Sequence, residues 1–182
     1  MHSTPIKPPA VPLTDGIVSL RPRQLSDLDA ISDASRDPEA QRWLTDPPAI
    51  GPMDAGARAA SMARAAQAYA TGRSAPLVIA DAPADQPIGL INVQFRDDEL
   101  ATIAYSVFPG HRGRGVAPRA VRLAVDWAFS GLGLTRLLLE IDPGNLASIR
   151  VAQKCGFAPA GQTDAGDKLV FAIRRPASGP GA

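Results

Sequence analysis

The chain has 182 residues and a formal net charge of +1, with 19 Lys and Arg against 18 Asp and Glu. This length suits one domain that buries roughly 70% of its unfolded surface, and the balanced charge provides no basic footprint for nucleic acid. Because Cys155 is the only cysteine, an internal disulfide and a cysteine-rich metal site are excluded.

The two ends of the chain are rich in proline and small residues. Four prolines precede residue 13, and residues 176–182 are Pro, Ala, Ser and Gly. Such composition is typical of loose linkers, so we expect flexible tails at residues 1–14 and 176–182 around a single domain at 15–175. No apolar run suits a signal peptide or reaches the roughly 20 residues of a membrane span. We expect a cytoplasmic protein with no membrane partner.

The domain opens with one strand and helical segments. Residues 16–21 carry the apolar side chains of a strand, and Ser26-Asp27 is a helix-start signal. The segment Asp37-Pro38-Glu39 restarts a helix that runs through Trp43 and Leu44.

A Pro-rich loop at residues 45–52 separates this part from an Ala-rich helix at 54–70, which stops before Gly72. The helix could pack against its own sheet or another subunit, which leaves a homodimer open. Two strands follow at 76–80 and 88–95, with turn-forming residues between them.

The next segment combines a strand, a glycine loop and a helix. Residues 102–107 predict a strand and residues 119–129 a helix, and the loop between them reads Arg112-Gly113-Arg114-Gly115-Val116-Ala117. Glycines allow a tight turn, and the start of a helix directs unpaired N–H groups toward an anion. The loop is therefore a candidate phosphate cradle; the alternative is a glycine turn that only starts a helix.

Two well-known phosphate loops do not fit. A dinucleotide fingerprint needs glycine or alanine at position 118, which is Pro118, and no Lys-Ser or Lys-Thr follows the glycines as in an ATP-type loop. A Rossmann-type oxidoreductase, which would bind nicotinamide tightly, is therefore disfavoured.

The last segment adds a second motif. Residues 135–141 predict a buried strand, and Asn145 is suited to cap a short helix that runs to Lys154 and stops at Gly156. This stretch contains Asn-x-x-Ser at 145–148 and Gly-Phe at 156–157.

Taken together, residues 100–174 resemble the GNAT acetyltransferase superfamily, in the branch related to RimJ and RimL. The resemblance lies in the Arg-x-x-Gly-x-Ala loop, the Asn-x-x-Ser helix and the Gly-Phe pair. It implies an α/β (α+β) fold with a central mixed, mostly antiparallel sheet of about six to seven strands, helices on both faces and splayed strands at an acyl-CoA cleft. The element order β-α-α-β-β-β-α-β-α-β independently predicts a mixed sheet covered by helices.

The family resemblance implies an N-acetyltransferase that uses acetyl-CoA as acyl donor, without a metal, and transfers acetyl to a primary amine by direct attack on the thioester. The residues that it assigns to the coenzyme are Tyr105, Ser106, Val107, Arg112, Gly113, Arg114, Gly115, Val116, Ala117 and Asn145. Pro118 lacks an N–H, so one phosphate donor that the family often has is absent.

Two residues are candidates for catalysis. By resemblance, Ser148 is a general acid or a stabiliser of the departing thiolate; the alternative is a solvated residue in the first turn of a helix capped by Asn145. Glu140 is a candidate general base, with a solvent-facing strand carboxylate as the alternative. A Cys155 nucleophile with His111 as base is disfavoured, because a cysteine beside a helix end is more often a packing residue.

The sequence contains few signals for the amine that accepts the acetyl group. We expect its wall to combine residues 43–53, the edge of Tyr105 and the acidic turn 97–99, which would favour a cation. A protein N-terminal amine is the preferred acceptor, and a small-molecule amine or an antibiotic is the alternative. A non-catalytic acyl-CoA-binding sensor remains the rival from another functional class.

Overall fold

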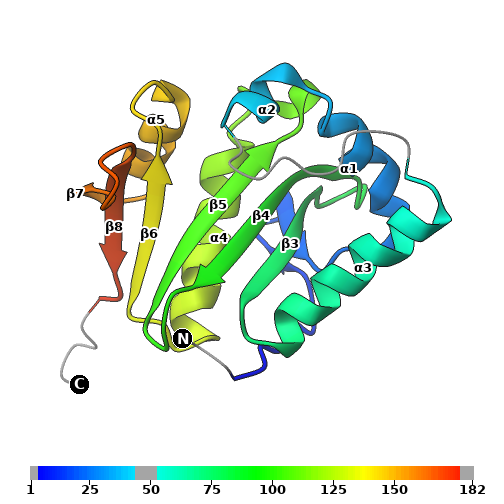
Figure 1. The fold of residues 1–182 in the computed structure, drawn as a ribbon, viewed down its shortest axis with the longest axis horizontal. Coiled ribbons are helices and arrows are strands. Elements are labelled where there is room, and N and C mark those ends of the chain that lie inside the picture. Colours follow the sequence, from blue (N-terminus) through cyan, green and yellow to red (C-terminus); the bar gives the residue numbers. More distant parts are fainter. Residues whose placement is uncertain (1–3, 44–52, 177–182) are drawn as a thin grey trace.

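The computed structural model describes residues 4–43 and 53–176. One sheet of eight strands runs through it in the order β1-β2-β3-β4-β5-β6-β8-β7 (Figure 1). The strands are β1 (Leu13–Thr14), β2 (Val18–Arg21), β3 (Ser74–Asp81), β4 (Pro87–Phe95), β5 (Leu100–Val107), β6 (Arg136–Ile141), β7 (Ala158–Gln162) and β8 (Leu169–Arg174). The helices are α1 (Leu28–Ala34), α2 (Pro38–Trp43), α3 (Ala55–Ala70), α4 (Val116–Ser130) and α5 (Leu146–Lys154), with 3-10 turns η1 (Leu25–Asp27) and η2 (Pro109–His111).

The sheet is mixed, as predicted from the sequence. Every neighbouring pair of strands is antiparallel except β5 and β6, which are parallel and connected through α4. Helix α4 lies on one face, and α1 and α3 lie on the other (Figure 1). The predicted fold class is confirmed, with eight strands in place of six to seven.

The two unpredicted strands are short or of unusual composition. Strand β1 has only two residues, and β7 contains Pro159 and Gly161 and is exposed along its whole length. Proline and glycine are rare inside strands but are tolerated at an edge, which is where β7 lies. Neither segment carries the alternating apolar pattern that identifies a strand in a sequence.

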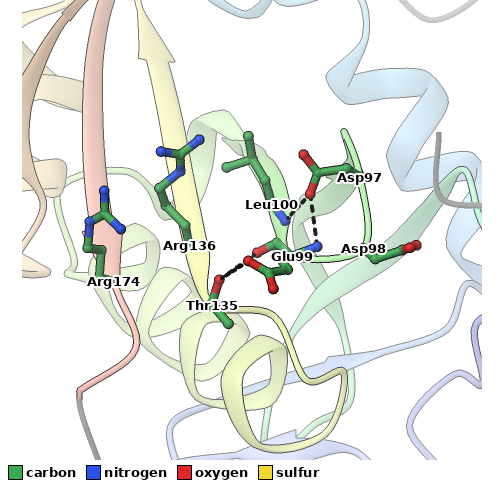
Figure 2. Close-up of a pocket in the computed structure, with 7 residues that line it drawn as sticks. All are labelled: Asp97, Asp98, Glu99, Leu100, Thr135, Arg136 and Arg174. Atoms are coloured by element: carbon green, nitrogen blue, oxygen red, sulfur yellow. Dashed lines mark hydrogen bonds between the residues drawn. The ribbon is translucent and has the colours of Figure 1, made fainter.

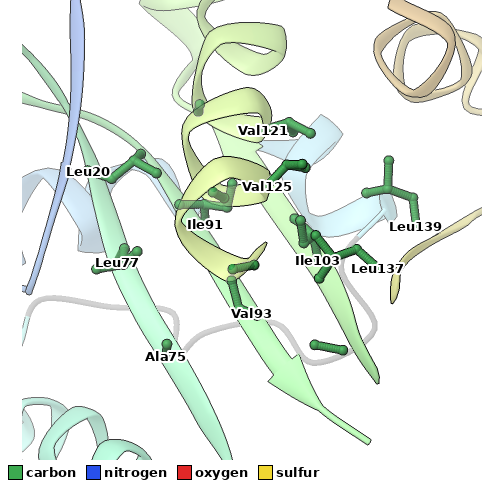
Figure 3. Packing of buried hydrophobic residues seen from close by; sticks show 14 of the residues in the cluster. Leu20, Ala75, Leu77, Ile91, Val93, Ile103, Val121, Val125, Leu137 and Leu139 are labelled. Atoms are coloured by element: carbon green, nitrogen blue, oxygen red, sulfur yellow. The ribbon is translucent and has the colours of Figure 1, made fainter. Parts of the chain in front are cut away.

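Alternating side chains of β3 pack into two hydrophobic clusters, one on each face of the sheet. Leu77 and Ile79 belong to the main cluster, in which β-strand side chains pack with Val121 and Val125 of α4 (Figure 3). The intervening residues pack on the opposite face: Val78 and Ala80 share a cluster with Leu28 and Ile31 of α1. Since successive strand residues point to opposite faces, β3 is buried on both sides.

A buried ion pair connects β2 to the α1 region. The guanidinium of Arg21 donates to both carboxylate oxygens of Asp27, at 2.8 and 2.9 Å, and the two side chains are 5% and 1% exposed. Arg21 also pairs with Asp85 at 2.6 Å. The hydrogen bonds from Arg21 to Asp27 raise the pKa of Arg21 further above its ordinary value, so the guanidinium stays charged.

Part of the predicted N-terminal tail is docked onto the domain. Ile6 is buried, its N–H donates to the Tyr69 carbonyl at 2.9 Å, and β1 pairs with β2. The packed structure therefore begins before the predicted boundary at residue 15. The predicted loop at 45–52 and residues 177–182 of the predicted C-terminal tail lie outside the described residues. Within the described chain, no helix combines the length and apolarity needed to cross a membrane.

Candidate active site

The sheet opens between β5 and β6. Their parallel pairing covers only the first three residues of each strand, ending at Thr102 opposite Leu138. Strand β5 then continues to Val107 and remains paired with β4 on its other side. The backbone of residues 103–107 consequently has no strand partner on the side of β6. This is the splay that the sequence analysis predicted.

The end of β5 is held by a close approach of β4 at Gly89. A Cβ atom at position 89 would lie 2.6 Å from the Ser106 carbonyl oxygen and 3.3 Å from the Val107 Cα. Only glycine allows the two backbones to come this close. Immediately beyond, the Phe108 N–H donates to the Ile88 carbonyl at 2.9 Å. The geometry of Ser106 and Val107, both predicted coenzyme contacts, therefore depends on Gly89.

The glycine loop leads directly into α4. Gly113 and Gly115 have φ angles of +73° and +76°, and Gly115 is the N-cap of the helix without any side-chain cap. Among the described residues, no hydrogen-bond acceptor is found for the backbone N–H groups of residues 113–117. These groups lie at the positive end of a 15-residue helix, an arrangement suited to a phosphate group.

The side chain of Arg112 does not serve this loop. Its guanidinium donates to Asp37 at 2.6 Å, to Glu39 at 2.9 Å and to the Val107 carbonyl at 3.0 Å. The predicted pairing of Arg112 with phosphate would need these bonds to break. In this structure Arg112 fastens α2 to the end of β5.

Helix α2 lies across the open ends of β5 and β6. Asp37 caps it by accepting from the Ala40 N–H at 2.7 Å and holds Arg112 on the β5 side. At its other end Trp43 approaches the turn after β6, where a Cβ atom at Gly144 would lie 3.6 Å from the indole ring. Figure 1 shows α2 above the carboxyl end of β5. Of the predicted acceptor wall at residues 43–53, only Trp43 and Met53 belong to the described residues, so its placement stays a prediction.

The short helix α5 follows β6 at the same end of the sheet. The Asn145 side chain accepts the Ser148 N–H at 3.0 Å, which confirms the predicted N-cap. Burial raises the pKa of the Tyr105 phenol, and the Ser148 hydroxyl lowers it in part. The roles of Asn145 toward the coenzyme and of Ser148 in catalysis remain predictions.

Cys155 connects the end of α5 to the start of α4. Its thiol donates to the Pro118 carbonyl at 3.4 Å, and burial raises its pKa. A nucleophilic cysteine needs a thiolate, and this environment favours the thiol. The packing role that the sequence suggested fits the structure better than a Cys155–His111 pair.

Glu140 lies on the face of β6 opposite the buried Leu139 and Ile141. Its carboxylate accepts from Arg96 at 2.9 Å, and the same guanidinium donates to Thr102 at 3.0 Å. A role as general base remains a prediction, and it would require Glu140 to share its carboxylate with Arg96.

The acidic turn at residues 97–99 lies at the wrong end of β5 for the predicted acceptor wall. Figure 2 shows it lining an open cavity of about 520 Å³ with Thr135, Arg136 and Arg174, at the amino ends of β5 and β6. Six residues of extended chain separate Glu99 from Tyr105, about 20 Å at about 3.3 Å per residue. This part of the acceptor prediction is wrong, because a strand carries its two ends to opposite edges of the sheet.

A second open depression, of about 480 Å³, adjoins the glycine loop. It is lined by Asp15, Gly115, Pro118, Arg119, Arg122, Leu123, Asp126 and Lys154. Arg119 pairs with Asp15 at 2.6 Å, and Arg122 donates to the Lys154 carbonyl at 2.7 Å. The depression therefore combines three cationic side chains with two acidic ones, Asp15 and Asp126, next to the start of α4.

Comparison with known proteins adds independent findings. The family described as an acetyltransferase (GNAT) domain matches residues 18–158. Among curated proteins, the probable N-acetyltransferase YjcK of Bacillus subtilis is 43% identical over 63 residues, which is 35% of this chain and 35% of YjcK. The match thus spans about a third of the length of that relative.

Two solved structures share the fold over most of the chain. RimJ of Mycobacterium smegmatis, in complex with CoA-disulfide, has a TM-score of 0.70 with 23% identity, covering 96% of this chain and 87% of RimJ. Spermidine N-acetyltransferase of Vibrio cholerae, in complex with CoA and spermine, has a TM-score of 0.69 with 18% identity, covering 88% of this chain and 96% of the other. At these identities the likeness is one of fold.

Proposed function

The chain belongs to the GNAT acetyltransferase family, and from that membership we propose that it transfers the acetyl group of acetyl-CoA to a primary amine, preferably the α-amine of a protein N-terminus. GNAT acetyltransferases use acetyl-CoA as co-substrate. The observation that carries the proposal is the row of N–H groups at residues 113–117, which have no acceptor among the described residues and lie between the end of β5 and the start of α4.

The coenzyme diphosphate would be held by these N–H groups, at the positive end of α4. The Arg122 and Lys154 side chains beside Gly115 would add positive charge for further phosphate of the nucleotide, whereas Arg119 already pairs with Asp15. Pro118 contributes no donor. Arg112 is assigned to holding α2, because its guanidinium already makes three bonds.

The pantetheine arm and the thioester would occupy the splay. Residues 103–107 have no strand partner on that side, so their backbone groups are available to the arm. A backbone N–H aimed at the oxygen of the thioester carbonyl as it becomes negative contributes about 2.7–4 kcal/mol in comparable sites. Tyr105, Ser106 and Val107 are the residues that supply such groups.

The reaction needs a neutral amine and a stabilised leaving group. The nitrogen lone pair forms the new C–N bond, the C–S bond breaks with its electron pair on sulfur, and the nitrogen loses a proton. Ser148, on the first turn of α5, is proposed to donate a hydrogen bond to the departing thiolate. Glu140, beside Arg96, is proposed to take the proton from the amine, directly or through water.

The acceptor would enter beneath α2, whose Trp43 lies near the turn after β6. RimJ and RimL are N-terminal acetyltransferases of ribosomal proteins, so the resemblance of the loop and Asn-x-x-Ser motifs to that branch supports a protein N-terminus. A polyamine is the second candidate, since the spermidine N-acetyltransferase of similar fold is in complex with spermine.

A thiol-release assay tests the proposal. Acetyl-CoA is mixed with lysine-free peptides that start with a free Ala or Ser, with the same peptides blocked at the N-terminus, and with spermine, and products are identified by mass. Turnover of the free peptides alone supports the preferred acceptor, and turnover of spermine alone supports the second. Coenzyme binding without turnover on any acceptor favours a sensor, and absence of coenzyme binding contradicts the proposal.

A further inference from the structure

The chain has two tyrosines, and their hydroxyl groups differ. The Tyr69 hydroxyl donates to the Pro76 carbonyl at 2.8 Å. The Tyr105 hydroxyl is buried and has no hydrogen-bond partner in residues 4–43 and 53–176. A buried hydroxyl without a partner is unfavourable and uncommon in native proteins. The contrast indicates that the Tyr105 hydroxyl serves a contact that forms when the site is used.

Tyr105 lies inside the splay. It follows the last residue pair between β5 and β6 by three positions, and it faces the same side of the sheet as Ile103. It packs against the main hydrophobic cluster together with Ile149 and Cys155. The phenol is thus held by packing within the opening, at the position where the proposed function puts the thioester.

Ser148 is the polar neighbour of this phenol. Burial raises the pKa of Tyr105 to about 12, and the nearby Ser148 hydroxyl partly offsets that effect. The two hydroxyls do not form a bond of normal geometry in this structure. Tyr105 therefore stays neutral across the physiological range and can only donate or accept a hydrogen bond. The other titratable group that influences it is the Cys155 thiol, which donates to Pro118.

We infer that Tyr105 is a positioning residue for Ser148: once the coenzyme is bound, the Tyr105 hydroxyl donates to Ser148 Oγ, so that the Ser148 hydrogen points at the departing sulfur. This inference rests on the proposed function. A serine hydroxyl carries one hydrogen and accepts through its lone pairs, so a donor on the oxygen directs the hydrogen elsewhere. Hydrogen bonds of this kind are often poorly aligned in a free enzyme and tighten in the complex. No proton leaves Tyr105, and sulfur departs as the thiolate with the C–S electron pair.

Tyr105→Phe and Tyr69→Phe form a matched pair of variants. Tyr105→Phe should lower kcat by about tenfold and leave the acetyl-CoA Kd and the Tm near the wild-type values, because the lost hydroxyl had no partner in the free protein. In a Ser148→Ala background the same change should have no further effect on kcat, since it acts through Ser148. Tyr69→Phe should do the reverse, lowering Tm through loss of the bond to Pro76 and leaving kcat unchanged.

A readout that needs no acceptor uses tyrosine labelled with ¹³C at Cζ. Two tyrosines give two resonances, assigned with the Phe variants. Added CoA should shift the Tyr105 resonance and leave Tyr69 in place, and the shift should shrink in Ser148→Ala. The inference is overturned if CoA binds by calorimetry and the Tyr105 resonance does not respond, or if Tyr105→Phe keeps wild-type kcat. Failure of CoA to bind at all would instead overturn the proposed function, and this inference with it.

Discussion

The β3–β4 and β5–β6 junctions of the same sheet are built in opposite ways. Strands β3 and β4 are paired over seven residues, from Ser74 opposite Gln94 to Ala80 opposite Pro87, whereas β5 and β6 share three pairs and then separate. Near the first junction, Arg21 and Asp27 satisfy each other in a buried pair. Near the second lie the N–H groups of residues 113–117 and the Tyr105 hydroxyl, which have no hydrogen-bond partner in the part of the chain that the structure describes. One junction is closed by paired groups, and the other leaves groups available to the proposed coenzyme.

The largest effect should come from the closed side of the sheet. Asp27→Asn leaves the buried Arg21 guanidinium without its bidentate partner, and we expect a loss of about 3–5 kcal/mol in the free energy of unfolding. Urea unfolding measures it. Asp33→Asn is the control, because Asp33 pairs with Arg36 on the surface and should cost at most about 1 kcal/mol. Equal losses for both variants would contradict the assignment of Asp27.

On the open side, Ser148→Ala should affect rate and leave stability unchanged. The helix cap survives, since Asn145 accepts the backbone N–H of residue 148. Loss of the hydroxyl should lower kcat about 100-fold, measured by thiol release under saturating acetyl-CoA. Ser130→Ala removes a hydroxyl that donates to the Asp126 carbonyl in α4 and should keep full activity. Wild-type kcat in Ser148→Ala would remove the serine from the mechanism.

The third prediction concerns the glycine loop. Gly115→Ala places a side chain on a residue with φ of +76°, at a cost of about 1–2 kcal/mol, and relaxation of the loop should displace its N–H groups. We expect the Kd for CoA, measured by calorimetry, to rise about tenfold, which is 1.4 kcal/mol. Gly110→Ala, in open space and without a positive φ, is the matched control. A normal Kd in Gly115→Ala would show that the loop tolerates the change.

Variants of the two loop arginines, Arg112 and Arg114, distinguish phosphate binding from the attachment of α2 to β5. Arg112→Ala should leave the Kd for CoA within about threefold, lower the free energy of unfolding by about 1 kcal/mol, and increase hydrogen exchange in α2. Arg114→Ala should leave α2 unchanged. A double-mutant cycle with Asp37→Asn should show coupling with Arg112. A large rise in the Kd for CoA in Arg112→Ala alone would show that Arg112 binds the coenzyme phosphate.

The smallest expected effect is the contribution of the Arg112–Asp37 ion pair to the loss of stability at acid pH. The hydrogen bond from Arg112 lowers the pKa of Asp37 below its ordinary value of 3.8. A lowered pKa in the folded state means that the stabilisation is complete above the ordinary value and is lost as pH falls through the lowered one. Stability between pH 5 and pH 3 should therefore fall less steeply in Asp37→Asn than in the wild type. Parallel curves would show that the pair contributes nothing.

Local signals predicted most of the elements. Gly72 and Gly156 both have positive φ directly after helices, and Asn145 caps α5 as expected. These features depend on residues within one turn of each other, so a sequence carries them. The fold class and the splay came from the family resemblance, whose motifs are also local.

Contacts between residues that lie far apart in the sequence were not predicted. Arg112 lies 75 residues from Asp37 and 73 from Glu39, and no local pattern encodes such a pairing. The contact inferred between Tyr105 and Ser148 likewise joins residues far apart in the sequence. The turn at 97–99 was assigned to the acceptor although it lies at the far end of β5. In each case the missing information was which strand ends share an edge of the sheet.

In the proposed complex the acyl donor also has a structural role, which follows from the short parallel pairing of β5 and β6. The sheet consists of two antiparallel sections, β1–β5 and β6–β8, joined along three residue pairs and through α4. A long, thin molecule in the gap would stand in for an absent strand, since it would meet main-chain groups that a continuous sheet satisfies internally. Binding of the acyl donor would then make the sheet continuous across the gap, and its release would leave two separate half-sheets again.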